Sequence, residues 1–222
     1  MLIKNYLIVI RPLNVVITFI SVWLAAMISP DFALNYKVLF AAIAASLVMA
    51  GANIINDISA GQDDKEILFL ASEREVPIIL MHMKGTPKTM QENPSYEDVL
   101  AEVIVALKQR VDEALAAGIK KENIAVDPGI GFGKRREDNI ALLAHIDKVV
   151  AIGYPVLLGT SRKRFMGSLC SVSEPSELVT ATAVTTALGV MSGVQMFRVH
   201  DVKENRQAAE VAWVIKNASQ TD

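Results

Sequence analysis

Five groups of polar side chains that could bind a ligand or take part in catalysis occur after residue 55, and each directly follows a short apolar run. They contain carboxylates, an amide, lysine, arginine and histidine, which form directed hydrogen bonds and ion pairs with bound molecules. The groups are Asn56–Asp57, His82, Asp127, Gly159–Lys163 and Arg198–Asp201. Packing alone does not produce a polar group after each of five successive apolar runs, so the groups together predict one binding site.

Each group, taken singly, also has a structural explanation. The Asn56–Asp57 pair could cap a helix, because both side chains accept hydrogen bonds from backbone amides. The glycines within positions 129–133 could serve only a tight turn. Lys163 and Arg198 could be solvated surface charges, and His82 could equally be structural. The prediction of a site therefore depends on the joint placement of these residues.

The apolar runs have the length and composition of short strands that are buried on both faces of a parallel sheet. Asn56–Asp57 would end the first of them, and the others are expected at Val76–Met81, Ile124–Val126, Pro155–Leu158 and Val194–Phe197. Helical stretches lie between the runs. This alternation predicts a parallel α/β sheet or barrel, in which the chemistry takes place at the C-terminal ends of the strands.

Residues 95–117 are the clearest of the helical stretches. Ser95 together with Asp98 is expected to cap the first turn, and Gly118 is expected to end the helix. Its apolar positions recur every four residues, at Val99, Val103, Leu107, Val111 and Leu115.

The first 56 residues differ in composition from the rest of the chain. They contain only four charged side chains, and residues 13–30 and 38–56 contain none. Each uncharged run approaches the ~20 residues that cross the hydrocarbon core of a bilayer. Lys4 and Arg11 precede the first run, which favours a cytoplasmic N-terminus. We therefore expect a transmembrane helical hairpin that returns the chain to the cytoplasm; the alternative is a pair of buried helices in a soluble domain.

Net charge and cysteine content argue against other classes of function. The net charge is −2 at pH 7, which leaves no basic surplus to neutralise phosphates, so we expect no nucleic-acid partner. The only cysteine, Cys170, can form neither an internal disulfide nor a cysteine-based zinc cluster. We expect Cys170 to be a buried or half-buried thiol.

The N-terminal segment resembles the start of the UbiA-type intramembrane prenyltransferases. The resemblance rests on Arg11–Asn14 at the first apolar run and on Gly51–Asp57 at the end of the second. In that family an aspartate-rich motif follows the second helix and holds magnesium against a prenyl diphosphate. Asp57 and Asp64 match this motif, whereas Ala60 replaces its middle aspartate. The later helices of the family have no counterpart here, so prenyl transfer is disfavoured.

The rest of the chain, from about Asn56 onward, resembles dihydropteroate synthase of the folate pathway. The sequence around the five polar groups is similar to the fourth to eighth strand-end motifs of that family, in the same order. The matching segments are Asn56–Gly61, Leu80–Pro87 with Met90–Gln91, Asp127–Lys134, Gly159–Lys163 and Arg198–Val202. An ordered series of this kind is far more specific than any single motif.

The resemblance implies an activity and a role for individual residues. The enzyme condenses 6-hydroxymethyl-dihydropterin diphosphate with p-aminobenzoate and releases diphosphate, with Mg²⁺ bound to the diphosphate. The substrate-binding residues that it implies are Asn56, Met83, Asp127, Phe132, Gly159, Ser161 and Lys163, of which Ser161 lies beside p-aminobenzoate. The residues that it implies in catalysis are Lys163, Arg198 and His200, of which the last two bind the diphosphate leaving group.

The expected fold is α/β, a partial (β/α)8 TIM-type barrel at 57–222 preceded by an all-α transmembrane hairpin at 1–56. The hairpin would anchor the chain in a membrane through residues 13–55, with the C-terminal domain in the cytoplasm. A homodimer is a further expectation. Residues 1–55 do not match the family's first three strands, which carry its magnesium-binding asparagine and a second pterin-binding aspartate. Turnover by this chain is therefore expected to be very weak.

Two alternative functions are a truncated UbiA-type prenyltransferase and a pterin-binding methyltransferase domain that acts on a folate. The methyltransferases share the barrel and the Asp-Pro-Gly motif. They would not be expected to carry Thr160–Lys163 or the Arg198–His200 pair. Dihydropteroate synthase is therefore the favoured interpretation.

Overall fold

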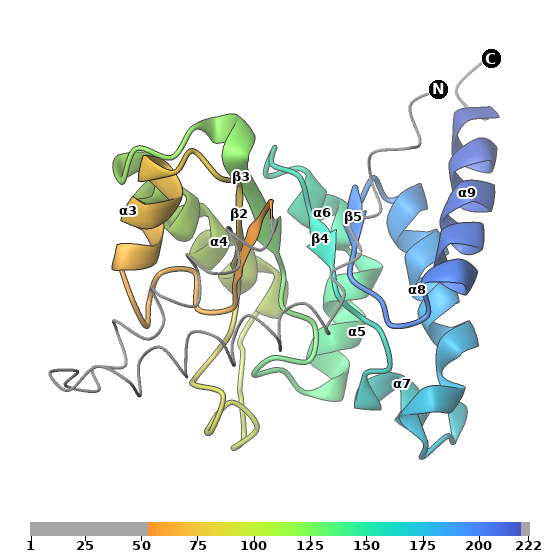
Figure 1. The fold of residues 1–222 in the computed structure, drawn as a ribbon. Coiled ribbons are helices and arrows are strands. Elements are labelled where there is room, and N and C mark those ends of the chain that lie inside the picture. Colours follow the sequence, from red (N-terminus) through yellow and green to blue (C-terminus); the bar gives the residue numbers. More distant parts are fainter. Residues whose placement is uncertain (1–52, 219–222) are drawn as a thin grey trace, which may run out of the picture.

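The computed structural model describes residues 53–218, over which parallel strands alternate with helices in the order of the sequence (Figure 1). The five strands of this range are β1 (Ile55–Asp57), β2 (Ile78–Met81), β3 (Ile124–Asp127), β4 (Leu157–Leu158) and β5 (Met196–Phe197). Each apolar run predicted to be a strand contains one, which confirms the alternating pattern. Three of the strands begin two residues later than predicted; in β2 and β4 the excluded residues include Pro77 and Pro155, which have no N–H for a strand ladder.

The five strands form one nearly continuous parallel arrangement. Strands β1, β2 and β3 pair in that order, β4 pairs with β5, and a bridge between Val126 and Val156 joins the two groups. In the first group Met81 lies opposite Asp127. Because all the strands run in the same direction, their C-terminal ends lie at one edge of the sheet, which is the lower edge in Figure 1.

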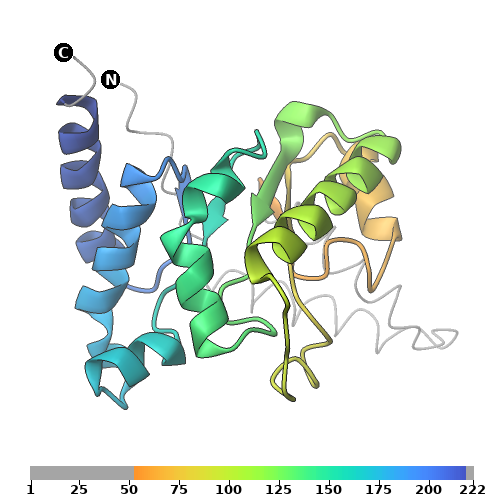
Figure 2. The same ribbon diagram turned by 180° about the vertical axis from the view of Figure 1, so that it is seen from behind.

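The helices cover one side of the sheet, as the view from behind shows (Figure 2). They are α3 (Glu66–Glu73), α4 (Val99–Ala116), α5 (Arg136–Ala144), α6 (Ile146–Val150), α7 (Arg164–Cys170), α8 (Val179–Met191) and α9 (Val202–Ala218), with short 3₁₀ helices at Lys121–Asn123 and Pro175–Glu177. All side chains of β2 and β3 are buried. Alternate residues face the helices, where Ile78 and Val126 belong to the main core, and the opposite face, where Ile79, Ala125 and Leu157 form a smaller cluster.

Helix α4 follows the predicted pattern with two corrections. The N-cap is Asp98, whose side chain accepts a hydrogen bond from the Ala101 amide, whereas Ser95 lies outside the helix. The first four predicted apolar positions are buried, but Leu115 is 39% exposed and Ala114 takes its place in the core. A helix has 3.6 residues per turn, so a strict four-residue spacing drifts off the buried face after several turns. Gly118 follows the helix at φ +92°, which confirms the predicted stop.

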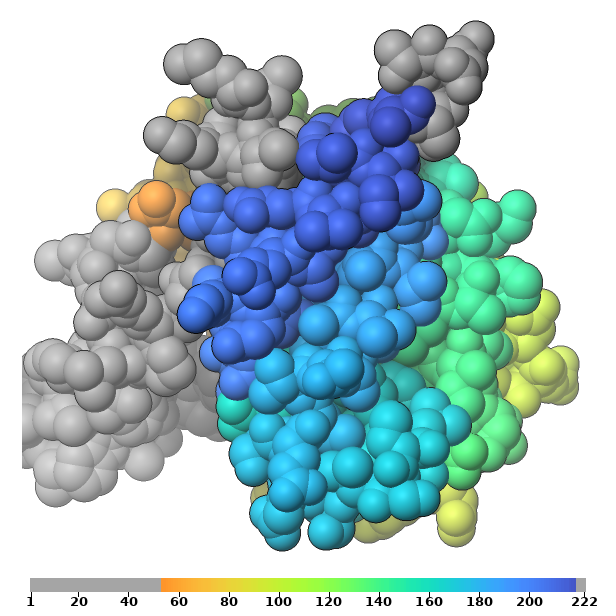
Figure 3. Space-filling view, turned by 90° about the vertical axis from the view of Figure 1, so that its right-hand side faces the viewer, coloured from red at the N-terminus to blue at the C-terminus, as the bar shows by residue number. Residues whose placement is uncertain are grey.

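Helices α8 and α9 pack closely together and form the blue part of the surface that faces the viewer in Figure 3. Within the pair, the buried Thr186 hydroxyl donates a 2.6 Å hydrogen bond to the Asn205 side-chain oxygen. The outer faces carry exposed apolar side chains, namely Val184, Leu188 and Met191 on α8 and Val211, Trp213, Val214 and Ile215 on α9. The prediction for Cys170 was wrong, because this residue is exposed at the last turn of α7, a helix that buries its earlier residues.

The predicted membrane hairpin lies outside the described residues except at its end. There the structure differs from the prediction, because Ile55 begins β1 and donates a backbone hydrogen bond to Pro77. The second helix therefore cannot extend to residue 55. The Asp57 carboxylate accepts hydrogen bonds from the Ser59 amide, the Ser59 hydroxyl and the Gly61 amide, so it caps its own loop. Within residues 53–218 the structure contains no helix with the length and apolar character of a membrane span.

Candidate functional site

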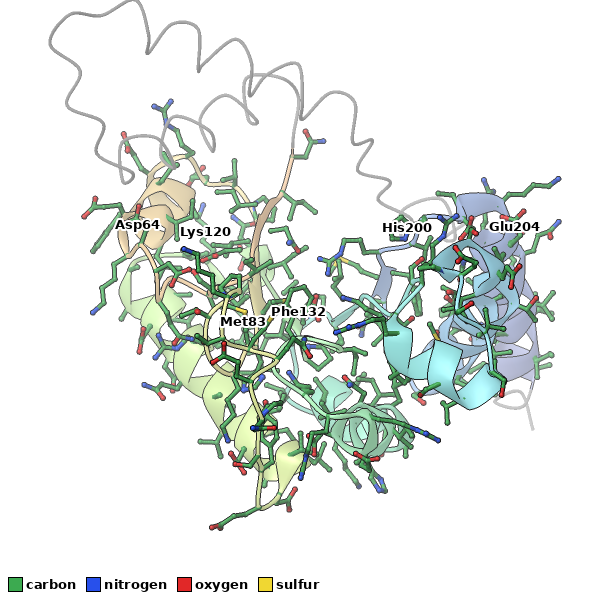
Figure 4. The ribbon with its side chains drawn as sticks, turned by 90° about the horizontal axis from the view of Figure 1, so that it is seen from below. Asp64, Met83, Lys120, Phe132, His200 and Glu204 are labelled. Carbon is green, nitrogen blue, oxygen red and sulfur yellow. The ribbon has the colours of Figure 1, made fainter. Side chains whose placement is uncertain are left out.

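The five polar groups meet at the C-terminal edge of the sheet. Figure 4 looks onto this edge from below and shows Met83 and Phe132 near the middle, with His200 on the C-terminal side. Each group is fixed by the strand that it ends or follows, since the strands are short and parallel and β2, β3 and β4 are fully buried. Side chains that are far apart in the sequence thereby come within hydrogen-bond distance of one another.

Asp127 is the buried carboxylate at the centre of the site, with 1% of its surface exposed. Its Oδ1 accepts a 2.7 Å hydrogen bond from the Gly129 amide, and its Oδ2 lies 3.4 Å from Arg198 Nη2. Burial raises the pKa of Asp127, while Arg198, the Gly129 amide, Lys134 and Lys163 act in the opposite direction. The nearby positive charges thus offset the cost of removing an ionised carboxylate from water.

Arg198 follows β5, and its side chain contacts residues of β1 and β3. Its Nη1 donates a 2.9 Å hydrogen bond to the Asn56 side-chain oxygen, and its Nη2 reaches Asp127. Gly159 provides the space for this guanidinium, because a Cβ at that position would lie 2.8 Å from Nη2. Asn56 and Asp127 together therefore hold a planar group that donates several hydrogen bonds.

Lys163 and Phe132 approach the site from two different loops. The Lys163 ammonium lies 4.2 Å from the centre of the Phe132 ring, a cation–π geometry. Gly131 gives the lysine stem room, since a Cβ there would lie 3.1 Å from Lys163 Cδ. Burial lowers the pKa of Lys163, Arg198 lowers it further, and Asp127 opposes both effects.

Ser161 and His200 form a second contact within the site. The Ser161 hydroxyl lies 2.9 Å from His200 Nδ1, and the His200 backbone amide donates to the same oxygen at 3.1 Å. Ser161 is buried, whereas His200 is exposed. Arg162 and Asp201 flank this pair and form an ion pair with two hydrogen bonds of 3.1 and 2.6 Å. The loops after β4 and β5 are thus held together, and the free edge of the His200 ring remains accessible to a ligand.

The structure brings most of the predicted site residues together. Contacts or electrostatic interactions connect Asn56, Asp127, Gly159, Lys163, Arg198 and Phe132. Ser161 and His200 form a pair of their own on the β5 side. Met83 is half-buried in the loop after β2, and Figure 4 places it in the same region as Phe132.

Lys134 is a charged residue of the site that the sequence did not single out. It is only 4% exposed, and its ammonium donates to His82 Nδ1 at 2.9 Å, to Gly129 O at 2.9 Å and to Phe132 O at 3.0 Å. Burial lowers the pKa of Lys134 to about 7 and that of His82 to about 3. Its position at the end of a glycine-rich loop was the only sequence signal, and that signal does not distinguish a buried lysine from an exposed one.

The glycine-rich loop passes close to the backbone that follows β2. A Cβ at Gly129 would lie 1.8 Å from the His82 carbonyl oxygen, and one at Gly133 would lie 2.2 Å from that of Lys84. Both glycines have positive φ angles, +66° and +61°. Here the loop requires glycine for its conformation and for the close approach of two backbones.

The arrangement favours a ligand that has both a planar donor edge and negative charge. Asp127 and Asn56 offer acceptor oxygens, while Arg198, Lys163 and His200 offer donors around them. Helix α9 begins at Val202, directly after His200 and Asp201, so its N-terminal amides lie on the same side. In the described part of the chain, no three His, Cys, Asp or Glu side chains are grouped so that they could hold a metal ion.

Known proteins are similar to this chain in sequence and fold. The family model described as "Pterin binding enzyme" matches residues 16–200. The dihydropteroate synthase of Neisseria meningitidis serogroup B is 43% identical over 169 residues, which are 75% of this chain and 59% of that protein. The Yersinia pestis dihydropteroate synthase, solved with a sulfonamide drug, has a TM-score of 0.77 at 36% identity, covering 80% of this chain and 64% of that one.

Dihydropteroate synthase from Thermus thermophilus has been solved in complex with 6HMPPP and in complex with 4-aminobenzoate. Both structures have a TM-score of 0.73 and cover 78% of this chain, at 39% and 38% identity, and the matched part is 68% and 70% of those chains. The similarity to these solved enzymes confirms the α/β, barrel-type part of the predicted fold.

The extent of the matches bears on the prediction of a partial barrel and on the resemblance of the N-terminal segment to UbiA-type enzymes. The chain spans about three fifths of the length of the curated relatives it matches. The family match begins at residue 16 and so includes most of the segment that resembles the UbiA-type enzymes. Nothing in these comparisons supports that second resemblance.

Proposed function

Since the chain belongs to the family of pterin-binding enzymes, we propose that it is a dihydropteroate synthase of folate biosynthesis. It would join 6-hydroxymethyl-dihydropterin diphosphate to p-aminobenzoate and release diphosphate. The observation that carries this proposal is the guanidinium of Arg198, which is held between Asn56 Oδ1 and the buried Asp127 carboxylate. The amino-pyrimidine edge of a pterin presents the same planar set of N–H donors as a guanidinium.

The pterin ring would take the place of the Arg198 guanidinium on Asn56 and Asp127. Lys163 would donate to the ring from the opposite side, and Phe132 would supply an apolar surface beneath it. Met83, in the neighbouring loop, would add to that surface. Arg198, released from its two partners, would then be free to reach the diphosphate.

The diphosphate would lie toward the β5 side of the site. Arg198 carries a positive charge there, and His200 and the first amides of α9 add hydrogen-bond donors. Mg²⁺ would enter with the diphosphate as part of the substrate, because the described residues do not form a carboxylate site of their own for it. The positive groups would stabilise the charge that develops on the leaving oxygen.

The second substrate would approach from the loop after β4. Ser161 lies in this loop beside His200, and the similar Thermus thermophilus enzyme has been solved with 4-aminobenzoate. In the reaction the aryl amine attacks the pterin methylene carbon, a C–N bond forms, and the C–O bond to diphosphate breaks. The amine proton is released and the electron pair of the broken bond stays on diphosphate. The protein's part is to orient the two substrates and to stabilise the leaving group.

Binding and turnover of the full chain provide the test. Calorimetry with 6-hydroxymethyl-dihydropterin diphosphate should show binding, and Asp127→Asn should weaken it by roughly 10–100-fold, because a charge-assisted hydrogen bond contributes about 1.5–3 kcal/mol. The exposed Asp147→Asn substitution is the matched control and should leave the affinity unchanged. Diphosphate release that depends on p-aminobenzoate would support the synthase reaction. Absence of pterin binding by the unmodified chain would refute the proposal, and binding of a methylated folate without p-aminobenzoate dependence would favour the methyltransferase alternative.

The predicted location is a separate proposal that stands on the sequence alone. We propose that the uncharged segment between residue 13 and the start of β1 anchors the chain in a membrane and leaves the domain at 57–222 in the cytoplasm, because two uncharged runs of near-spanning length follow Lys4 and Arg11. Alkaline carbonate extraction of membranes that contain the full chain should leave it in the pellet. Complete release into the supernatant would refute the anchor without affecting the pterin proposal.

A homodimer is proposed for the described domain. The exposed apolar residues on α8 and α9 form a surface of the kind that is usually covered by a partner. Sedimentation should show a dimer for the unmodified chain and a monomer for Val214→Glu, whereas a monomer in both would refute this assembly.

A further inference from the structure

Lys134 is the most completely buried cation of the described residues near the site, and every N–H of its ammonium has an acceptor. An ammonium group has three donors, and three acceptors surround it within 3.0 Å: His82 Nδ1, Gly129 O and Phe132 O. A further contact to His82 O measures 3.4 Å. A buried lysine is rare unless its charge is matched in this way, so the arrangement calls for a specific explanation.

We propose that Lys134 is a positioning residue that clamps the glycine-rich loop after β3 to the end of β2, and so holds Asp127 and Phe132 where the pterin binds. This role rests on the proposed function and deepens it, because it assigns the shape of the pterin pocket to a side chain that contacts no substrate.

The clamp acts on both ends of the loop. Gly129 follows Asp127 by two residues and donates its amide to the Asp127 carboxylate, while its carbonyl accepts from Lys134. At the other end, the Phe132 carbonyl accepts from Lys134 and the Phe132 ring lies under Lys163. One ammonium therefore fixes the backbone on either side of the proposed pterin contacts.

The third acceptor ties the loop to a different strand. His82 directly follows β2, and its backbone amide continues the ladder to Asp127 O at 2.9 Å. To accept from Lys134 at Nδ1, the imidazole must be neutral with its proton on Nε2. Lys134 therefore couples the ends of β2 and β3 through side chains as well as through the backbone.

Other contacts support the loop but do not replace the clamp. The Tyr96 hydroxyl donates to Gly133 O at 2.7 Å, and the Gly131 amide donates to Asn139 Oδ1 at 2.7 Å. Neither contact reaches the carbonyls of Gly129 or Phe132. A methionine at position 134 would fill a similar space but leave the Phe132 carbonyl without a donor. The Gly129 carbonyl would keep only the Phe132 backbone amide, which donates to it at 3.0 Å, so the loop should stay folded and become mobile.

Hydrogen exchange tests the clamp without reference to activity. In Lys134→Met, amides of residues 129–133 and of His82 should exchange at least about tenfold faster, the ratio that corresponds to ~1.4 kcal/mol of lost protection. Amides within α8 and α9 should be unchanged. Lys108→Met, at an exposed position of α4, is the matched control and should alter neither region. Unchanged exchange in Lys134→Met would overturn the proposal.

A milder pair of substitutions covers the case in which Lys134→Met does not fold. His82→Leu removes one acceptor of the ammonium, whereas His82→Asn keeps an acceptor oxygen near the position of Nδ1. Exchange at residues 129–133 should rise in His82→Leu and rise less in His82→Asn. Equal exchange in the two variants would mean that the Lys134–His82 contact does not hold the loop.

Substrate kinetics then connect the clamp with the pterin pocket. Lys134→Met should raise the KM for the pterin diphosphate about tenfold and leave the KM for p-aminobenzoate near its original value, since the clamp lies on the pterin side. A selective change in p-aminobenzoate KM would overturn the assignment. If the unmodified chain binds no pterin, the proposed function fails, while hydrogen exchange still decides whether the clamp exists.

Discussion

Replacing Gly159 with alanine should weaken the binding of the pterin diphosphate, because the new methyl group would displace the side chain of Arg198, which follows a different strand. The new Cβ would lie 2.8 Å from Arg198 Nη2, 3.4 Å from its Cζ and 3.5 Å from its Nε. Gly159 does not have a positive φ angle, so the backbone accepts alanine without strain. The guanidinium is the end of a flexible side chain, and we therefore expect it to move while the strand remains in place.

The size of the effect follows from the contact that Arg198 would make with the diphosphate in the proposed complex, for which it leaves Asn56 and Asp127. The added methyl group would displace the guanidinium and so weaken the hydrogen bonds that it donates to the diphosphate. A hydrogen bond to a charged group contributes about 1.5–3 kcal/mol, and the partial exposure of Arg198 places the loss near the lower end. We expect the affinity for pterin diphosphate to fall by roughly tenfold, with the melting temperature nearly unchanged.

A double-mutant cycle with Arg198→Ala separates this explanation from a direct one, in which the alanine methyl touches the pterin itself. If the effect passes through Arg198, then Gly159→Ala should have little further effect in the Arg198→Ala background. Calorimetry on the four proteins measures the coupling. Equal losses of affinity in both backgrounds would show that the reasoning about Arg198 is wrong.

Three other substitutions or conditions give distinct outcomes. Gly129→Ala would place a Cβ 1.8 Å from the His82 carbonyl oxygen at φ +66°, so thermal unfolding should occur several degrees lower and pterin binding should be lost; an unchanged melting temperature would contradict the tight approach. Because burial and then Lys134 lower the pKa of His82 to about 3 from its ordinary 6.5, the unfolded chain binds this proton first as the pH falls. The free energy of unfolding should thus decrease between pH 6.5 and 3 by roughly 2–5 kcal/mol, and urea titrations of His82→Asn should show a shallower decrease. Arg162→Met breaks the ion pair with Asp201, so turnover should fall about threefold to tenfold through the loosened Ser161–His200 pair, and unchanged steady-state kinetics would show that the pair is held by other contacts.

The strand ends were predictable from the sequence because of the way these strands are buried. A strand covered on both faces appears as an uninterrupted apolar run, and the first polar residue after it marks the edge where the strand leaves the core. Asp127 and Arg198 are found in this way without knowledge of the fold. Their convergence follows because parallel strands end at the same edge of a sheet.

Other features depend on distances that the sequence does not encode locally. A lysine at the end of a glycine-rich loop would ordinarily be exposed to solvent. Lys134 is buried only because the end of β2 lies beside that loop. Ser95 and Asp98 are both residue types that often cap helices. In the structure Asp98 is the N-cap, with an extended backbone at φ −137° and ψ 99°. The contact of Arg198 with Asn56 and Asp127 likewise required the three-dimensional structure.

The hydrogen bond between Asn56 and Arg198 joins residues that are 142 positions apart in the sequence. A contact of such long range is entropically expensive to close, and topologies rich in them fold slowly. The site is therefore complete only after nearly all of the described chain has found its place. A ligand that bridges these two strand ends would bind the native state and not its partly folded precursors, and it would shift the folding equilibrium by mass action. Substrate concentration during biosynthesis should accordingly influence how much of the polypeptide reaches its native state.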